Sequence, residues 1–249
     1  MIRQKQPKVN GIPALVFWTA VWYLAAKVMD NPLLLPDPIR VLRCLGAMVV
    51  TSAFWQNAAV SMLRILLGVG CAVLLGTVLA VLSGKSRLLH GLIAPAMTAM
   101  QATPVASITI LVLIWVNRDY VPVLICAMMG LPIVWSSVSS GIRMTDPQLL
   151  EMAKVYRLSR LKVLQRIYIP SVRPYFLAAC SSGLGLGWKA GVAAEVLTVP
   201  KASIGRMISE SKLYLMTEEL FAWTLTVVVL SLLLQKLMLL VLNRRDRHA

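Results

Sequence analysis

The sequence predicts an all-α integral membrane protein with six transmembrane helices. Of its 249 residues, 58% are hydrophobic and 14% are charged, whereas a soluble domain carries about 45–50% apolar and about 25% charged residues. Six apolar segments are long enough to cross about 30 Å of hydrocarbon, which takes about 20 residues as a helix. Basic residues outnumber acidic ones by 25 to 10, and in a membrane protein such a surplus indicates cytoplasmic loops.

The six predicted spans follow one another along the chain. The first is longer than the apolar core of a signal peptide, about 7–15 residues, so we expect it to remain as a span. Pro104 and Pro132 interrupt the third and fourth spans and predict kinks, or alternatively a cavity lined by freed carbonyl groups. The spans are Ile12–Val28, Ala58–Leu82, Leu92–Val116, Val121–Ile142, Pro174–Thr198 and Leu220–Leu242.

The distribution of Lys and Arg predicts the orientation of these spans. If the N-terminus is cytoplasmic, the inside segments hold 15 of the 25 basic residues and three of the 10 acidic ones. This asymmetry predicts a multi-pass protein of the cytoplasmic (inner) membrane with both termini inside. The chain then divides into residues 1–29 with the first span, an external segment 30–57, and a core of five helices at 58–249.

The sequence contains few residues that could support enzymatic catalysis or metal binding. The two histidines, His90 and His248, are far apart, and the four cysteines stand singly in apolar surroundings. Such cysteines are typical of small buried hydrophobic residues rather than of a disulfide or zinc framework. We therefore expect no catalytic residues, no metal site, no cofactor and no nucleic-acid partner.

The inside loop at 143–173 is the most strongly patterned segment. Thr145 and a Gln three residues later form a capping-box pattern, which predicts a short helix over Pro147–Tyr156. Ser159 is expected to cap a second helix, Arg160–Ile167, that Pro170 ends. The second helix is basic on one side, so it would either lie on anionic lipid headgroups or dock against a cytoplasmic partner.

Motifs in and around this loop resemble those of a known family. Glu151-Met152-Ala153, followed 16 residues after the Glu by Ile167-Tyr168-Ile169-Pro170, is similar to the EAA loop of ABC importer permeases. The segments LPDP at 35–38, SMLRILLG at 61–68 and LGWKAGVAAEVL at 186–197 resemble the nitrate/sulfonate/taurine-type branch of that family. The likeness covers about residues 30–249, in order and with matching topology.

The resemblance implies a type I importer-like permease subunit that moves a small solute, such as a sulfonate, nitrate, taurine or a vitamin precursor. It implies a homodimer, two ATPase subunits that bind ATP and Mg, and an extracytoplasmic substrate-binding protein. Within the EAA loop, Arg157 replaces the usual turn glycine, which favours positive φ, and so predicts a different turn or a more continuous helix. The residues implied in ATPase docking are Glu151, Ala153, Arg157, Leu158 and Ser159.

Three ionisable residues, Arg64, Lys189 and Glu195, fall at membrane depth or near its outer boundary. Because buried charge is costly, such residues normally face a pathway or a partner, although Arg64 could equally snorkel to the outer interface. Lys189 lies about 200° around the helix from Gly187, whereas Glu195 lies near the glycine row, so these two charges should not pair. We expect Lys189 to line a translocation path and Glu195 to hold an outer gate.

Gly183, Gly187 and Gly191 recur every four residues on the fifth predicted span. Small residues at this spacing allow close helix approach, within one chain or, less favoured here, across a dimer. Three alternatives to a sulfonate-type importer are a permease of another importer branch with amino-acid or metal substrates, a secondary transporter and a membrane enzyme. The last two are disfavoured, because no internal repeat and no cluster of His, Asp or Glu is present.

Overall fold

The computed structural model describes residues 11–244, and within this range the regular elements are all helices, without strands. The predicted all-α class is therefore confirmed for the described residues. The predicted cytoplasmic termini, residues 1–10 and 245–249, lie outside them. The elements are α1 Gly11–Met29, α2 Pro38–Val49, α3 Ser52–Lys85, α4 Arg87–Ala102, α5 Val105–Leu113, α6 Val121–Arg143, α7 Pro147–Val155, α8 Arg160–Val163, the π-helix η1 Leu164–Tyr168, α9 Ile169–Thr198, α10 Ile204–Leu213 and α11 Thr217–Arg244.

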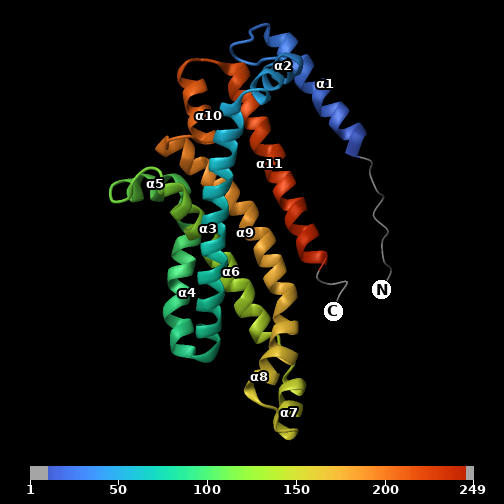
Figure 1. Cartoon of the computed structure of the whole chain (residues 1–249), viewed down its shortest axis with the longest axis vertical. Coiled ribbons are helices and arrows are strands. Elements are labelled where there is room, and N and C mark those ends of the chain that lie inside the picture. Colours follow the sequence, from blue (N-terminus) through green and yellow to red (C-terminus); the bar gives the residue numbers. More distant parts are fainter. Residues whose placement is uncertain (1–10, 245–249) are drawn as a thin grey trace.

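Helices α3, α6 and α9 form the centre of the molecule, with α6 packed along both of the others (Figure 1). Small residues allow this close packing. A Cβ atom added at Gly68 would lie 2.5 Å from the Val123 carbonyl oxygen of α6, and one added at Gly76 would lie 2.8 Å from the Val134 Cβ. Helix α11 packs against α9 and also contacts α2 and α10.

Three helical segments in the described range are long and apolar enough to cross a membrane: Ser52–Gly84, Val121–Arg143 and Thr217–Met238. They match the second, fourth and sixth predicted spans. The second begins earlier than the predicted Ala58, because the Thr51 hydroxyl accepts a hydrogen bond from the Phe54 N–H and caps α3. Helix α1 supplies a shorter apolar helix, and α9 covers the fifth predicted span.

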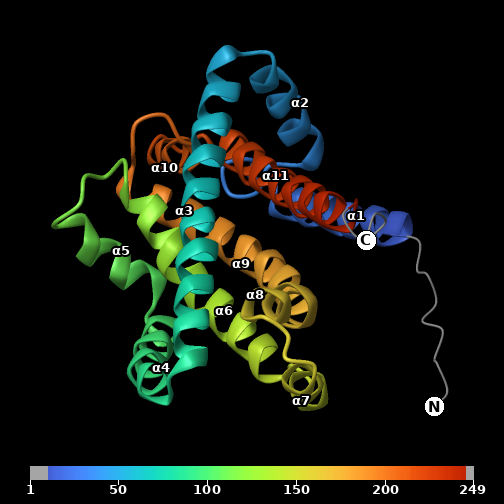
Figure 2. The same ribbon diagram turned by 60° about the horizontal axis from the view of Figure 1, so that its bottom comes forward.

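The third predicted span, Leu92–Val116, is interrupted at Pro104, where the sequence predicts a kink or a cavity lined by freed carbonyl groups, and the bend there is far sharper than a kink. The chain breaks at Thr103 and Pro104 into α4 and α5, which are bent by 101° relative to each other (Figure 2). Helix α4 packs against α3 and α6, whereas α5 packs against α6 and α9, so each half follows a different neighbour. At Pro132, in contrast, α6 continues as one helix from Val121 to Arg143.

The two ends of the bundle carry different elements (Figure 1). Helices α2 and α10 lie at one end, and α7 and α8 lie at the other. Two hydrogen bonds hold the predicted external segment, residues 30–57, at the α2–α10 end. The Trp22 indole N–H donates to the Pro36 carbonyl at 3.1 Å, and the Thr217 hydroxyl donates to the Leu33 carbonyl at 2.8 Å. The two candidate sites described below lie toward these opposite ends.

Candidate functional site

The first site is the loop that carries α7 and α8. The predicted first helix is present as α7, but its cap differs from the predicted capping box. The Asp146 carboxylate accepts from the Gln148 N–H at 2.8 Å, while the Thr145 hydroxyl donates to the Gly141 carbonyl at 3.3 Å. A carboxylate at this position accepts from a free amide of the first turn, and it suits the positive end of the helix dipole.

Arg157 itself adopts the conformation that the missing glycine would favour, with φ of 51°. The Leu158 N–H donates to the Ala153 carbonyl at 2.9 Å, and the Arg157 N–H donates to the Lys154 carbonyl at 3.0 Å. This pair of hydrogen bonds is a Schellman motif, the usual glycine-ended helix stop. The expectation of a different turn or a more continuous helix was therefore wrong, because the two hydrogen bonds hold an arginine in the left-handed region.

Beyond this turn, α8 does not stop at Pro170 as predicted. It runs through η1 into α9, and the Ile169 N–H donates to the Leu164 carbonyl five residues earlier. Pro170 lies inside this continuous helix, directly after the π-helical turn where the spacing of the backbone hydrogen bonds changes. The loop is consequently joined to the long central helix α9 by continuous helical backbone.

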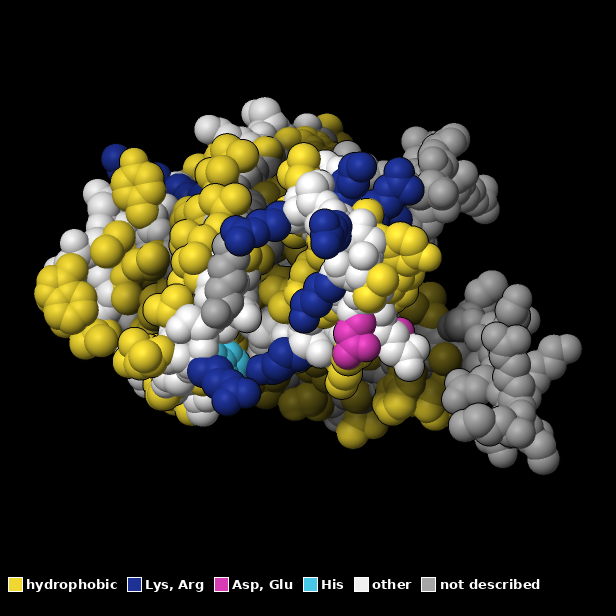
Figure 3. All heavy atoms as spheres, turned by 90° about the horizontal axis from the view of Figure 1, so that it is seen from below, with side chains coloured by type: hydrophobic (Ala, Val, Ile, Leu, Met, Phe, Trp, Pro, Cys, Tyr) yellow, Lys and Arg dark blue, Asp and Glu magenta, His cyan; other side chains and the backbone are white. Residues whose placement is uncertain are grey.

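The side chains implied in docking are not equally available on this loop. Glu151, Arg157 and Ser159 are exposed, and Leu158 is half-buried. Ala153 is only 3% exposed, so it packs within the chain and cannot present a side chain to a partner. Seen from this end, Lys and Arg side chains gather over the surface, with a small acidic patch at one side of the group (Figure 3).

The second site is a polar cluster around Glu195, toward the other end of α9. The Glu195 side chain is fully buried, and its Oε2 accepts from the Ser61 hydroxyl at 2.7 Å and from the Gly205 N–H at 3.2 Å. The Arg64 Nη1 lies 3.8 Å from the Glu195 Oε1. The Ser61 oxygen in turn accepts from the Ile204 N–H at 2.8 Å.

Arg64 extends this cluster to the connection between α9 and α10. Its guanidinium donates to the Ala202 carbonyl at 2.9 Å and to the Lys201 carbonyl at 2.8 Å, and it lies 3.6 Å from Asp119. The Asp119 carboxylate also accepts from the Lys201 N–H at 2.7 Å. The Arg64 side chain is 14% exposed and has these partners within the chain.

We name these residues the polar clamp: Ser61, Arg64, Asp119, Glu195, the carbonyls of Lys201 and Ala202, and the amides of Lys201, Ile204 and Gly205. It ties together α3, the α5–α6 connection, α9 and the start of α10. The connecting segment is held in an uncommon shape, because Val199 and Ala202 have φ of 47° and 44°. A β-branched residue in this region is a backbone outlier that its surroundings must support.

Sequence reasoning found two members of the polar clamp and missed the others. Arg64 and Glu195 stood out as ionisable residues in apolar segments. Ser61, Asp119 and Gly205 carried no comparable signal, although SMLRILLG begins with Ser61. Position 205 requires glycine because the backbone there packs closely against Glu195: an added Cβ atom would lie 2.3 Å from the Glu195 Cβ.

Lys189 lies away from the polar clamp, as its helical angle predicts. It is exposed on a face of α9 that the described residues leave uncovered, in line with the exposed Leu186, Ala193 and Leu197. The glycine row faces the other way. A Cβ atom at Gly187 would lie 2.7 Å from Val69 of α3, and one at Gly191 would lie 2.5 Å from the Cys126 sulfur of α6. The row thus packs within this chain.

Neither site resembles a metal centre, and the described residues contain no group of three His, Cys, Asp or Glu side chains that could hold an ion. One end presents an exposed loop joined to α9 by continuous helical backbone, and near the other end a buried polar clamp holds α9 to three other segments.

Comparisons with known proteins agree with one another. Residues 72–247 match the family described as "Binding-protein-dependent transport system inner membrane component". The chain is 28% identical over 227 residues to the taurine transport system permease protein TauC of Escherichia coli (strain K12), covering 88% of this chain and 82% of that protein. It is 23% identical over 213 residues to the putative aliphatic sulfonates transport permease protein SsuC of Bacillus subtilis (strain 168), covering 85% and 76%.

A solved structure has a similar fold. The crystal structure of an amino acid ABC transporter with histidines matches with a TM-score of 0.65 and 17% identity, covering 82% of this chain and 98% of that chain. At this level of identity the likeness concerns the fold alone.

Proposed function

Since this chain belongs to the family of binding-protein-dependent transport system inner membrane components, as an ABC importer permease of the sulfonate and taurine branch, we propose that it moves taurine or a related small sulfonate into the cell. Three of its relatives are named as permeases for taurine or aliphatic sulfonates, and each match covers 80% or more of this chain. The transporter would contain two copies of this chain, two ATPase subunits that bind ATP and Mg, and an extracytoplasmic binding protein.

The observation that carries the coupling proposal is the continuous backbone from α8 through η1 into α9. ATP-driven closure of the ATPase subunits would move the exposed α7–α8 loop, and α9 would move with it. Glu151, Arg157 and Ser159 would contact the ATPase, with Leu158 at the edge and Ala153 supporting the loop from within. A helix this continuous transmits movement without a chemical step, as a two-state rocking mechanism requires.

The same movement would reach the polar clamp near the other end of α9. We propose that Glu195 and Arg64 close the outer gate by holding α9 against α3 and the α9–α10 connection. Lys189, exposed on a separate face of α9, would line the path between two copies of the chain. An ammonium group on this face suits a water-filled pathway better than lipid.

The proposed topology keeps six crossings and counts the bent pair α4–α5 as one of them. The others are α1, α3, α6, α9 and α11. The α7–α8 loop and both termini would then be cytoplasmic, and α2 and α10 would face outward. The basic residues of the loop support this orientation, because cytoplasmic loops carry the surplus of Lys and Arg.

The test is reconstitution of the full complex, with its ATPase and binding protein, in proteoliposomes. We expect the taurine-loaded binding protein to stimulate ATP turnover and taurine uptake. Glu151→Lys should lower the stimulated turnover and weaken crosslinking of the loop to the ATPase, with insertion unchanged. Lys189→Met should abolish uptake while the dimer persists. Uptake of other solutes but not of sulfonates would contradict the proposed substrate, and unchanged uptake in both variants would contradict the proposed roles.

A further inference from the structure

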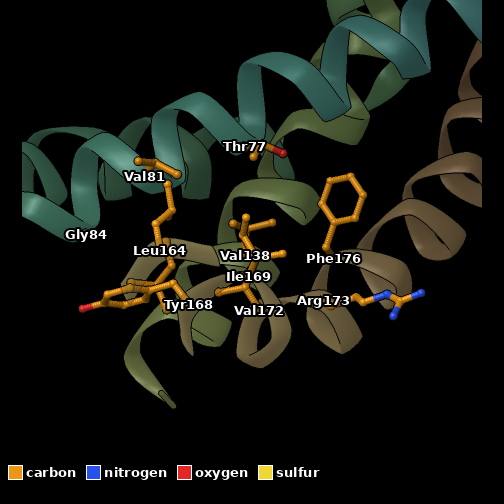
Figure 4. A pocket seen from close by; sticks show the side chains of 11 residues that line it. Thr77, Val81, Gly84, Val138, Leu164, Tyr168, Ile169, Val172, Arg173 and Phe176 are labelled. Atoms are coloured by element: carbon orange, nitrogen blue, oxygen red, sulfur yellow. The ribbon is translucent and has the colours of Figure 1, made fainter. Parts of the chain in front are cut away.

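An apolar cavity of about 440 Å³ lies beside the junction between η1 and α9. Its walls come from the last turns of α3, the last turns of α6, η1 and the first turns of α9 (Figure 4). Val81 of α3 and Leu164 of η1 lie on facing walls, and Phe176 of α9 forms part of the lining. The Thr77 hydroxyl donates to the Val73 carbonyl of its own helix, so this wall offers no free polar donor.

Polar groups are confined to the edge of this cavity. In Figure 4 the Tyr168 hydroxyl and the Arg173 guanidinium both point away from the apolar side chains. The surrounding surface is strongly basic, because residues 152–173 carry six basic side chains and no acidic one. The site therefore combines an apolar interior with a basic surface, at the depth where an apolar span meets the charged α7–α8 loop.

We propose that this cavity binds an anionic phospholipid, with an acyl chain between α3 and α9 and the phosphate headgroup beside the basic segment. Apolar lining suits hydrocarbon, and basic pockets between membrane helices on the cytoplasmic side suit anionic headgroups. The inference rests on the proposed function in one respect, since it takes the α7–α8 end as cytoplasmic. An occupant here contacts both sides of the η1–α9 junction and so lies against the proposed coupling route.

The experiment uses the full transporter in nanodiscs that contain phosphatidylglycerol with a photoactivatable acyl chain. Peptide mass spectrometry then locates the adducts. Val81→Trp fills the cavity from α3, and Val78→Trp is the matched control. Both valines are exposed on α3, at 43% and 49%, but only Val81 lines the cavity.

We expect adducts on residues 77–84 and 164–176 in the wild type and in Val78→Trp, and their loss in Val81→Trp. Unlabelled phosphatidylglycerol should compete for the wild-type adducts, a measurement that needs no variant. Equal labelling in both variants, or by photoactivatable phosphatidylcholine, would overturn the proposal. Absence of adducts from the wild type would also overturn it and would indicate that a second copy or the ATPase fills the cavity.

Taurine-stimulated ATP turnover in the same nanodiscs separates this inference from the proposed function. Site-specific adducts without turnover support the lipid site and contradict the transport proposal. Turnover without adducts supports transport and overturns the lipid site.

Discussion

At the scale of single residues, the polar clamp places a carboxylate in a fully buried position. Burial of a carboxylate such as that of Glu195 removes its hydration, at a cost of roughly several kcal/mol. Hydrogen bonds and a counter-charge must offset this cost. Here the Ser61 hydroxyl, the Gly205 amide and the Arg64 guanidinium supply them. Such a cluster is worth most when complete, because each missing partner leaves a buried group unpaired.

Ser61→Ala should therefore destabilise the permease. The change leaves the Ile204 N–H without its acceptor and removes one donor from Glu195, at a cost of about 1–3 kcal/mol for each buried group left unpaired. Ser139→Ala is the matched control, since the Ser139 hydroxyl is also buried but has no hydrogen-bond partner among residues 11–244. Thermal unfolding in detergent should show a lower midpoint for the first variant only. Equal midpoints would mean that the hydrogen bonds of Ser61 contribute nothing measurable.

Arg157→Gly should stabilise the α7–α8 loop. A non-glycine residue in the left-handed region costs about 1–2 kcal/mol, which glycine does not incur. Arg166→Gly removes the same charge from an exposed helical position and should cost about 1 kcal/mol instead. Thermal unfolding should therefore move in opposite directions for the two variants. A fall in both would show that the Arg157 side chain stabilises the turn by more than its backbone strain.

At the scale of helices, apolar length was enough to predict α3, α6 and α11, because a helix in lipid must satisfy its own backbone. It could not predict the 101° break between α4 and α5. Pro104 marks where the chain can bend, but the angle follows from packing on different neighbours. Hydropathy also could not predict that α8 continues into α9. A proline just inside a helix and a proline just after one look alike in sequence.

The polar clamp shows the same limit. Arg64 and Glu195 were recognisable one at a time, as charges in apolar helices. Their pairing joins positions more than a hundred residues apart through a loop whose shape no local pattern encodes. The angle between Lys189 and Glu195 was predictable, because both lie on one regular helix.

The junction between α8 and α9 yields a prediction at this scale. Gln165→Pro should uncouple the transporter, because a proline inside a helix removes a hydrogen bond and kinks it, at about 3 kcal/mol or more. The loop should still crosslink to the ATPase, while substrate-stimulated ATP turnover is lost. Gln165→Ala keeps the helix and serves as the control. Normal stimulation in the proline variant would contradict coupling through this backbone.

At the scale of the whole molecule, the two ends differ in charge and in construction. The α7–α8 end is basic and exposed (Figure 3), and the polar clamp with its buried charge pair lies toward the opposite end of the bundle. Only one assignment of these ends agrees with the surplus of Lys and Arg in cytoplasmic loops. The orientation and the coupling proposal therefore stand together, and one measurement tests both.

That measurement is labelling of single cysteines by a membrane-impermeant thiol reagent. Ser159 and Lys201 are exposed near opposite ends, and Lys201 contributes only backbone atoms to the polar clamp, so cysteine is tolerated at both. Cys44, Cys71 and Cys180 are replaced, and the buried Cys126 is kept. Ser159→Cys should react only in inverted vesicles, and Lys201→Cys only in intact cells. Labelling of position 159 from outside would overturn the orientation, and with it the docking of an ATPase on the α7–α8 loop.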